Sequence, residues 1–185
     1  MAFLSRPTAL AQRALGALAL LLGTLGHGGA TAQTPVNNSE TALKVAFIYN
    51  FTLFTQWPTD IGNTLNLCVV GQDSFGTALD VLQGKMAAGR TLVLHRKNTN
   101  ESLEMCQVLF IAPSAMGSLP RLLDNLADSP TLTIADSPGA ATRGVALNMN
   151  VVKNKVTFEA NLQAVRLAKL NLSSKLLRLA TEVVP

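Results

Sequence analysis

Few side chains in this chain of 185 residues could carry redox, metal or acid–base chemistry. Its two cysteines, Cys68 and Cys106, are separated by 38 positions. Thiol redox enzymes typically place two cysteines close together at a helix N-terminus, so this spacing does not predict thiol catalysis. Two possibilities remain, which are a structural disulfide and a pair of buried free thiols acting as small hydrophobic side chains.

Histidine-based chemistry is equally hard to place. His95 is the only histidine beyond residue 32, and it follows Thr91 and Val93 on one side of an alternating, strand-like segment. We interpret it as an ordinary strand-edge residue, because a His-rich zinc site needs further ligands and no triad partners are identifiable. The sequence therefore predicts no metal site.

A loop with two glycines superficially resembles a phosphate-binding loop. In "VVGQDSFGTA", Gly71 and Gly76 stand between a predicted strand and a predicted helix. The Lys-Ser/Thr pair of a phosphate loop is replaced by Thr77 and Ala78, so a tight turn is the favoured interpretation. Four acids lie on separate predicted elements and suggest no acid–base pair, namely Asp124, Asp128, Asp136 and Glu159. We predict no catalytic residue and no cofactor, and so a protein that is not an enzyme.

The first 32 residues have the composition of a signal peptide. Arg6 and Arg13 precede an apolar stretch, residues 14–25, that is too short to span a bilayer comfortably. The small residues at positions 30–32, Ala-Thr-Ala, fit a signal peptidase site, so we expect cleavage after Ala32 and export. An uncut N-terminal anchor is the alternative, and it is disfavoured because several glycines interrupt the stretch.

The net charge and the length of the chain beyond residue 32 limit the kinds of partner and the number of domains that we expect. Without residues 1–32 the chain keeps 13 Lys and Arg against 11 Asp and Glu, a net charge of +2. These charges are interspersed and most of the aromatic residues gather in one segment, which argues against nucleic-acid binding. Residues 33–185 suit a single domain with its own hydrophobic core.

Apolar runs alternate with helix-like segments along the chain. Segment 41–57 predicts a helix that Pro58 ends, with Leu43, Phe47, Phe51 and Phe54 on one face. The next segments predict strand, helix, strand, strand, helix and strand, at 65–71, 76–83, 90–96, 107–112, 117–127 and 131–136. Such alternation is typical of a largely parallel sheet with helices on its faces.

The last third of the chain has a different pattern. Two extended runs, 144–152 and 155–162, are joined around Lys153 and Asn154, which predicts an antiparallel hairpin. Two helical segments follow, 162–170 and 173–184, the second with Ser173 or Ser174 as its N-cap. We therefore predict an α/β fold with a mixed, largely parallel sheet flanked by helices and a C-terminal antiparallel hairpin.

Export bears on the state of the two cysteines. In an oxidising compartment an even number of cysteines is expected to pair, so we predict a disulfide between Cys68 and Cys106. The free-thiol alternative stays open, because a bridge directly across neighbouring parallel strands is geometrically demanding.

Several segments, in their order and spacing, resemble the YfiR-like family of bacterial periplasmic regulators over residues 43–184. They are "ALKVAFIYNFTLFTQWP", "LNLCVVGQDSFG", "LQGKMAAGRTLVL", "LEMCQVLFIAPS", "LTIADSPG" and "NKVTFEANLQAVRLAKLNLSSKLLRLA". The resemblance implies a periplasmic protein that binds and inhibits the sensor domain of an inner-membrane diguanylate cyclase, which lowers cyclic-di-GMP signalling and biofilm formation. It also implies a homodimer and an outer-membrane partner that sequesters the regulator.

The resemblance extends to the cysteines. Cys68 and Cys106 match the two positions of one family disulfide. A second, C-terminal disulfide of the family has no counterpart, because "TRGVALNMNVV" contains no cysteine. This absence argues against a redox switch that relies on the second bridge.

Partner binding requires exposed apolar surface, and two segments are candidates. They are the aromatic helix, with Phe51, Phe54 and Trp57, and the last helix, with Leu176, Leu177 and Leu179. Core packing is the competing interpretation, because an apolar helix face usually covers the sheet of its own domain. The alternative function is a small-solute-binding module in which loops 72–76 and 114–116 hold the ligand.

Overall fold

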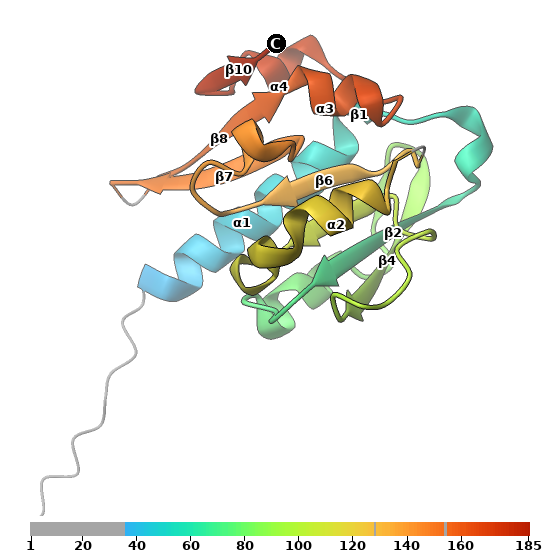
Figure 1. Cartoon of the computed structure of the whole chain (residues 1–185). Coiled ribbons are helices and arrows are strands. Elements are labelled where there is room, and N and C mark those ends of the chain that lie inside the picture. The colour runs from blue at the N-terminus through green and yellow to red at the C-terminus, as the bar shows by residue number, and fades with distance from the viewer. Residues whose placement is uncertain (1–35, 128, 154) are drawn as a thin grey trace, which may run out of the picture. The chain divides into compact units, whose positions relative to one another are not determined.

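The computed structural model describes residues 36–127, 129–153 and 155–185, and these residues build an eight-stranded sheet (Figure 1). The strands lie in the order β10-β8-β7-β6-β5-β2-β4-β3. They are β2 (Thr64–Val70), β3 (Met86–Ala87), β4 (Arg90–Lys97), β5 (Val108–Ile111), β6 (Leu132–Ala135), β7 (Leu147–Val152), β8 (Lys155–Asn161) and β10 (Glu182–Val184). A separate antiparallel pair joins β1 (Thr55–Gln56) to β9 (Asn171–Leu172). The predicted signal peptide, residues 1–32, lies outside the described residues.

The middle of the sheet is parallel and its ends are mixed. Strands β7, β6, β5, β2 and β4 run parallel to one another. Every residue of β5 and β6 is buried, as expected for strands with both faces covered. Strands β7 and β8 form the antiparallel hairpin, with Leu147 opposite Ala160 and Val152 opposite Lys155. The predicted mixed, largely parallel sheet with a C-terminal hairpin is confirmed.

Helices cover both faces of this sheet. Figure 1 shows α1 (Val36–Leu53) on one face and α2 (Leu119–Asp124) on the other. The remaining α-helices are α3 (Leu162–Leu167) and α4 (Ser174–Leu177), and the 3-10 helices are η1 (Thr59–Ile61), η2 (Gly76–Leu82), η3 (Pro113–Ser118) and η4 (Ala141–Arg143). The helix predicted over 76–83 is therefore a 3-10 helix, and the one predicted over 117–127 is divided between η3 and α2.

Two core layers follow from the alternation of side chains along the strands. Leu67 and Val69 of β2, with Phe110 of β5, point to the α1 face. Cys68 of β2 and Leu109 of β5 point to the α2 face. Since successive strand residues face opposite sides, each apolar run supplies both layers at once.

The buried face of α1 is rotated from the predicted one. Val45, Ile48, Phe51 and Thr52 are buried, whereas Leu43 is 45% exposed. Phe47 and Phe54 are partly buried and pack against the same core. The helix also ends at Leu53, earlier than predicted, because the next residues form β1 and pair with β9.

The helix predicted over 173–184 is wrong in its second half. Only α4 is helical, with the Ser173 hydroxyl accepting a hydrogen bond from the Leu176 N–H, as expected for an N-cap. The chain then forms β10, which pairs in parallel with β8. The open edge of β8 provides hydrogen-bond partners that outweigh the local helical pattern.

Candidate functional site

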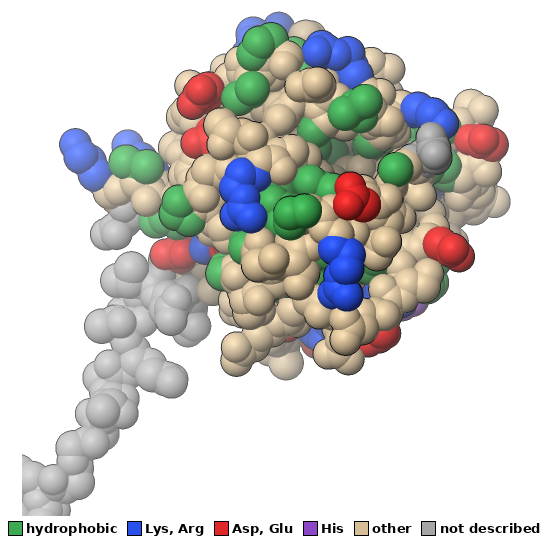
Figure 2. Space-filling model, in the orientation of Figure 1, with side chains coloured by type: hydrophobic (Ala, Val, Ile, Leu, Met, Phe, Trp, Pro, Cys, Tyr) green, Lys and Arg blue, Asp and Glu red, His purple; other side chains and the backbone are tan. Residues whose placement is uncertain are grey.

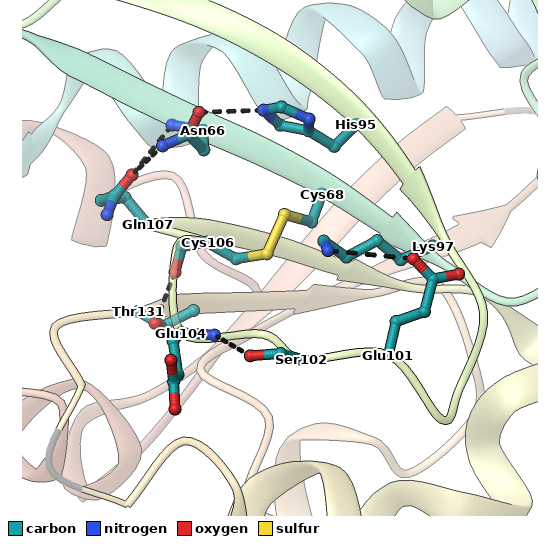
Figure 3. The surroundings of a disulfide bond; sticks show 10 residues. All are labelled: Asn66, Cys68, His95, Lys97, Glu101, Ser102, Glu104, Cys106, Gln107 and Thr131. Carbon is teal, nitrogen blue, oxygen red and sulfur yellow. Dashed lines mark hydrogen bonds and ion pairs between the residues drawn. A yellow bond between two sulfur atoms is a disulfide. The ribbon is translucent and has the colours of Figure 1, made fainter.

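The two cysteines form a disulfide between β2 and the turn before β5 (Figure 3). Their Cα atoms are 5.8 Å apart, and both residues are buried in the α2-face core. Cys106 precedes β5 by two positions, and its N–H donates to the Leu103 carbonyl in a turn. The bond therefore does not cross directly between two ladder positions. The predicted pairing is confirmed, and the free-thiol alternative is wrong.

Hydrogen bonds fix the surroundings of the disulfide. The Thr131 hydroxyl donates to the Cys106 carbonyl at 2.6 Å. The Gln107 side-chain oxygen accepts from both the backbone and the side-chain N–H groups of Asn66, at 2.9 and 3.0 Å. His95 donates from Nε2 to the Asn66 side-chain oxygen at 2.9 Å, since that oxygen can only accept. These bonds connect β4, β2 and the chain before β5 in one polar network, in which His95 is a structural strand residue.

The predicted partner-binding residues divide between core and surface. Phe51 is 0% exposed and its ring packs on Phe158 with centroids 4.9 Å apart, and Leu176 is 3% exposed. Neither side chain can contact a partner while the core is intact, so these two assignments are corrected to core packing. Phe54, Trp57 and Leu177 are partly buried against the same core. Leu179 is 71% exposed.

The structure brings the two candidate segments together. Pairing of β1 with β9 sets Thr55 opposite Leu172, and the Ser173 N–H donates to the Phe54 carbonyl at 3.0 Å. The partly exposed side chains of Phe54, Trp57, Leu172 and Leu177 pack against one core layer, and we name this group the β1–β9 surface. Sequence reasoning identified three of its four members separately, because the pairing of two two-residue strands leaves no sequence signal.

The two loops that the solute-binding alternative uses touch each other at the point where a ligand crevice is expected. This crevice would lie between the chain after β2 and the chain after β5, where the connections leave in opposite directions. There the Gln72 N–H donates to the Ser114 hydroxyl at 2.8 Å. A Cβ atom at Gly71 would lie 2.8 Å from the same hydroxyl oxygen, so the two loops are in direct contact.

A partly buried ion-pair cluster lies at the carboxyl end of β6. Lys44 of α1 contacts Glu40 at 2.8 Å and Asp136 at 2.9 Å. Burial lowers the pKa of Lys44, but hydrogen bonds and attraction from these two carboxylates more than offset this, so its pKa is raised. The second carboxylate oxygen of Asp136 is buried without a hydrogen-bond partner in the described structure. The Glu40–Lys44 spacing is the one sequence signal for this cluster.

Two cavities open on the described surface. A cavity of about 660 Å³ lies beside Asp136, Asn150 and Glu159, where Asn150 donates to Glu159 at 2.7 Å. A groove of about 470 Å³ lies between α2 and α3, lined by Leu123, Leu126, Thr133, Asn161, Ala164 and Leu167 among others. Figure 2 shows hydrophobic side chains gathered around a hollow on this face.

Two polar side chains that line the α2–α3 groove, Thr133 and Asn161, are hydrogen-bonded within the chain. The Thr133 hydroxyl accepts from the Ala146 N–H, and Asn161 bonds the Ala141 carbonyl and the Ala164 N–H. Within residues 36–127, 129–153 and 155–185, no three His, Cys, Asp or Glu side chains are placed to hold a metal ion. None of the helices in the same ranges has both the length and the apolar content that a bilayer crossing requires.

Two solved structures share this α/β fold. One is an ABC domain in complex with L-Trp from Streptococcus pneumonia, with a TM-score of 0.53, 9% identity and coverage of 78% of this chain and 60% of that chain. The other is a conserved domain protein from Vibrio cholerae O1 biovar eltor, with a TM-score of 0.54, 10% identity and coverage of 77% and 60%. At these identities the likeness shows the fold alone. The chain spans about 60% of the length of each of these two structures.

The family is defined by sequence. The profile of the YfiR/HmsC-like family matches residues 41–181, which run from α1 to the residue before β10. The chain therefore belongs to the YfiR/HmsC-like family, a family of periplasmic regulators and not of enzymes.

Proposed function

We propose that this protein binds and inhibits the periplasmic sensor domain of an inner-membrane diguanylate cyclase and so lowers cyclic-di-GMP signalling. Membership of a family of periplasmic regulators is the observation that carries this proposal. The contact between the loops after β2 and β5 also narrows the place where a solute-binding module would hold its ligand, which favours the regulator over that alternative. An outer-membrane protein that sequesters the regulator and a homodimeric state belong to the same proposal.

The β1–β9 surface is the proposed contact with the sensor domain. It combines aromatic and aliphatic side chains that pack against the hydrophobic core. The Trp57 indole N–H also donates to the Thr52 carbonyl at 3.1 Å, which fixes the position of this ring. Buried aromatic anchors contribute most to many protein interfaces. Leu179 borders this group in the sequence and is the most exposed of the residues predicted for partner binding.

Genetic epistasis tests the proposed function. Deleting the gene is expected to raise cellular cyclic-di-GMP and surface attachment, and the increase is expected to vanish when the partner cyclase is deleted too. A copy without residues 1–32 is expected not to repress, because it cannot reach a periplasmic sensor domain. Full repression by that copy, or unchanged cyclic-di-GMP on deletion, would contradict the proposal.

A surface variant locates the contact. Trp57→Ala is expected to abolish repression. The control is Val81→Ala, which also truncates a side chain to alanine but at an exposed position on η2, and this variant is expected to repress normally. Both variants need unchanged periplasmic levels and a cooperative melting transition. Normal repression by Trp57→Ala would remove the β1–β9 surface from the proposal but leave the epistasis result standing.

Export is tested by the mass of the periplasmic protein. We propose that the mature chain begins at Gln33 and is free in the periplasm. Intact-mass measurement of periplasmic extract is expected to give the mass of residues 33–185. A protein that retains residues 1–32 and sediments with membranes in about 0.5 M salt, which disrupts electrostatic adsorption, would contradict this.

A further inference from the structure

Four cations at the C-terminal end of the chain have no counter-ion among the residues that the structure describes. Arg166 lies on α3, Lys169 follows it, Lys175 lies on α4 and Arg178 follows that helix. All four are exposed, and none makes an ion pair or a side-chain hydrogen bond with the described residues. Lys44 and Arg96, in contrast, are each paired with two carboxylates.

The charge of the chain is unevenly distributed. Residues 162–185 contain four Lys and Arg and one acid, Glu182. Residues 33–161 contain nine Lys and Arg against ten Asp and Glu. The positive charge that remains beyond residue 32 is therefore concentrated in the last 24 positions of the sequence.

Two exposed leucines accompany these cations. Leu167 is 72% exposed and follows Arg166, and Leu179 is 71% exposed and follows Arg178. Helix α3 begins directly after β8 and contacts β10, and α4 leads into β10, so all three elements lie at one end of the molecule's sheet (Figure 1). Figure 2 shows Lys and Arg side chains beside hydrophobic ones over this end. We name the six residues the basic-apolar surface: Arg166, Leu167, Lys169, Lys175, Arg178 and Leu179.

We propose that the basic-apolar surface binds an anionic phospholipid bilayer, which holds the regulator against a membrane. Unpaired Lys and Arg side chains attract anionic headgroups, and neighbouring exposed leucines insert at the boundary with the acyl chains. The proposal goes beyond inhibition of a cyclase and does not depend on it.

A protein partner fits this surface less well. Protein interfaces are enriched in aromatic residues and Met and depleted in Lys, and leucine is under-represented among the residues that dominate their binding energy. Residues 162–185 contain no aromatic residue and no methionine, and two of their four cations are lysines. A bilayer needs no shape complementarity, which agrees with cations spread over two short helices and the turns after them.

Vesicle co-sedimentation of the exported protein tests the proposal. We expect binding to vesicles with about one-third phosphatidylglycerol and none to pure phosphatidylcholine, since each Lys or Arg near an anionic surface contributes about fivefold in affinity. Binding is expected to weaken strongly in about 0.5 M NaCl, where the Debye length is about 4 Å. This salt test involves no substitution and so cannot be confused with misfolding.

A pair of matched variants locates the surface. K175Q/R178Q removes two cations and is expected to weaken binding about 25-fold. K153Q/K155Q removes two exposed cations at the hairpin turn, at the opposite end of β8 from α3, and is expected to change binding by about twofold or less. L167S/L179S is expected to lower binding about tenfold without changing the net charge.

Three results would overturn the proposal. They are equal binding to both kinds of vesicle, an equal loss in the two double-Gln variants, and no vesicle binding together with retention on immobilised polyglutamate. The third result would assign the four cations to an acidic protein surface. A failed epistasis experiment would contradict the cyclase proposal and leave the vesicle result unaffected, so the two proposals fail separately.

Discussion

The two faces of the sheet are stabilised by different means. On the α1 face, aromatic rings fill the core, with Phe51 packed on Phe158 and Phe75 packed on Phe110 at a centroid distance of 4.7 Å. On the α2 face, the described core residues are aliphatic side chains, one Met and the Cys68–Cys106 disulfide, without an aromatic ring. The α1 helix has 18 residues, whereas α2 has six.

This difference shows how the face of the sheet that is packed by the shorter α-helix is stabilised. A long helix brings enough side-chain area to hold one face by burial alone. A helix of fewer than two turns brings much less, and a covalent bond between β2 and the chain before β5 limits the freedom of the unfolded chain instead. The two faces therefore predict different responses to truncation and to reductant.

The largest loss is expected from truncating the aromatic core of the α1 face. Phe51→Ala removes a fully buried ring and is expected to lower the free energy of unfolding by about 3–5 kcal/mol. Leu53→Ala, on the same helix but partly exposed, is expected to change it by less than about 1 kcal/mol. Urea unfolding followed by circular dichroism measures both, and a similar loss for the two variants would contradict burial as the source of stability on this face.

Removing the disulfide is expected to have the next largest effect. The disulfide closes a loop between two cysteines that are 38 positions apart in the sequence. The free energy of unfolding of C68A/C106A is therefore expected to be about 2–4 kcal/mol lower than that of the wild type. Reductant is expected to destabilise the wild type by a similar amount and to leave the double variant unchanged. Equal stability of the oxidised and reduced wild type would show that the α2 face does not need the covalent bond.

Breaking the ion pair between α1 and the end of β6 is expected to have a smaller effect. Lys44→Met leaves Asp136, whose side chain is 6% exposed, without its cation, at a cost of about 2 kcal/mol at neutral pH. The double variant K44M/D136N is expected to recover part of this loss, because it removes the uncompensated buried charge. Guanidinium melts of the two variants and the wild type test this, and no recovery would show that packing, not charge, is lost.

The same ion pair predicts a pH dependence. Burial lowers the pKa of Lys44, but bonds to Glu40 and Asp136 outweigh this, so the folded pKa lies above the ordinary value of 10.5. Its contribution to stability is complete below pH 10.5 and is lost as the pH rises through the folded pKa. The stability difference between wild type and Lys44→Met is therefore expected to shrink in that alkaline range, and a difference that grows with pH would contradict the assignment.

The smallest effect on stability is expected at the surface. Leu179→Ser is expected to change the free energy of unfolding by less than about 0.5 kcal/mol, because the side chain is exposed. Leu176→Ala, three residues earlier and buried, is expected to cost about 2 kcal/mol or more. Thermal melts of the two variants measure this difference between a surface position and a core position in α4 and the turn after it.

The sheet was predictable because its strands carry strong local signals. The apolar runs at β5 and β6 are buried along their whole length, and the hairpin of β7 and β8 is joined around Lys153, where the sequence predicts the turn. The disulfide followed from the compartment and the even number of cysteines. Each of these inferences depends on one segment or on composition alone.

Features that depend on distant segments were not predictable. Strands β1, β9 and β10 have only two or three residues, so their local patterns are too short to predict the pairing of β1 with β9 or of β10 with β8. The α2–α3 groove is lined by residues of α2, β6 and α3 that are far apart in the sequence and that only the packed sheet brings together. The sequence could not show whether Phe51 and Leu176 are buried in the core or exposed to a partner, because an apolar helix face has the same sequence pattern in both cases.

Strand β10 has a consequence for the solubility of this protein. It covers the outer edge of β8 at Glu159, Ala160 and Asn161, and Thr181 bonds the Phe158 carbonyl just before it. An uncovered edge of that length presents a row of unpaired N–H and C=O groups to any other extended chain. Residues 181–184 therefore protect this edge from strand-to-strand self-association, and the exposed charge of Glu182 on β10 opposes the addition of a further strand.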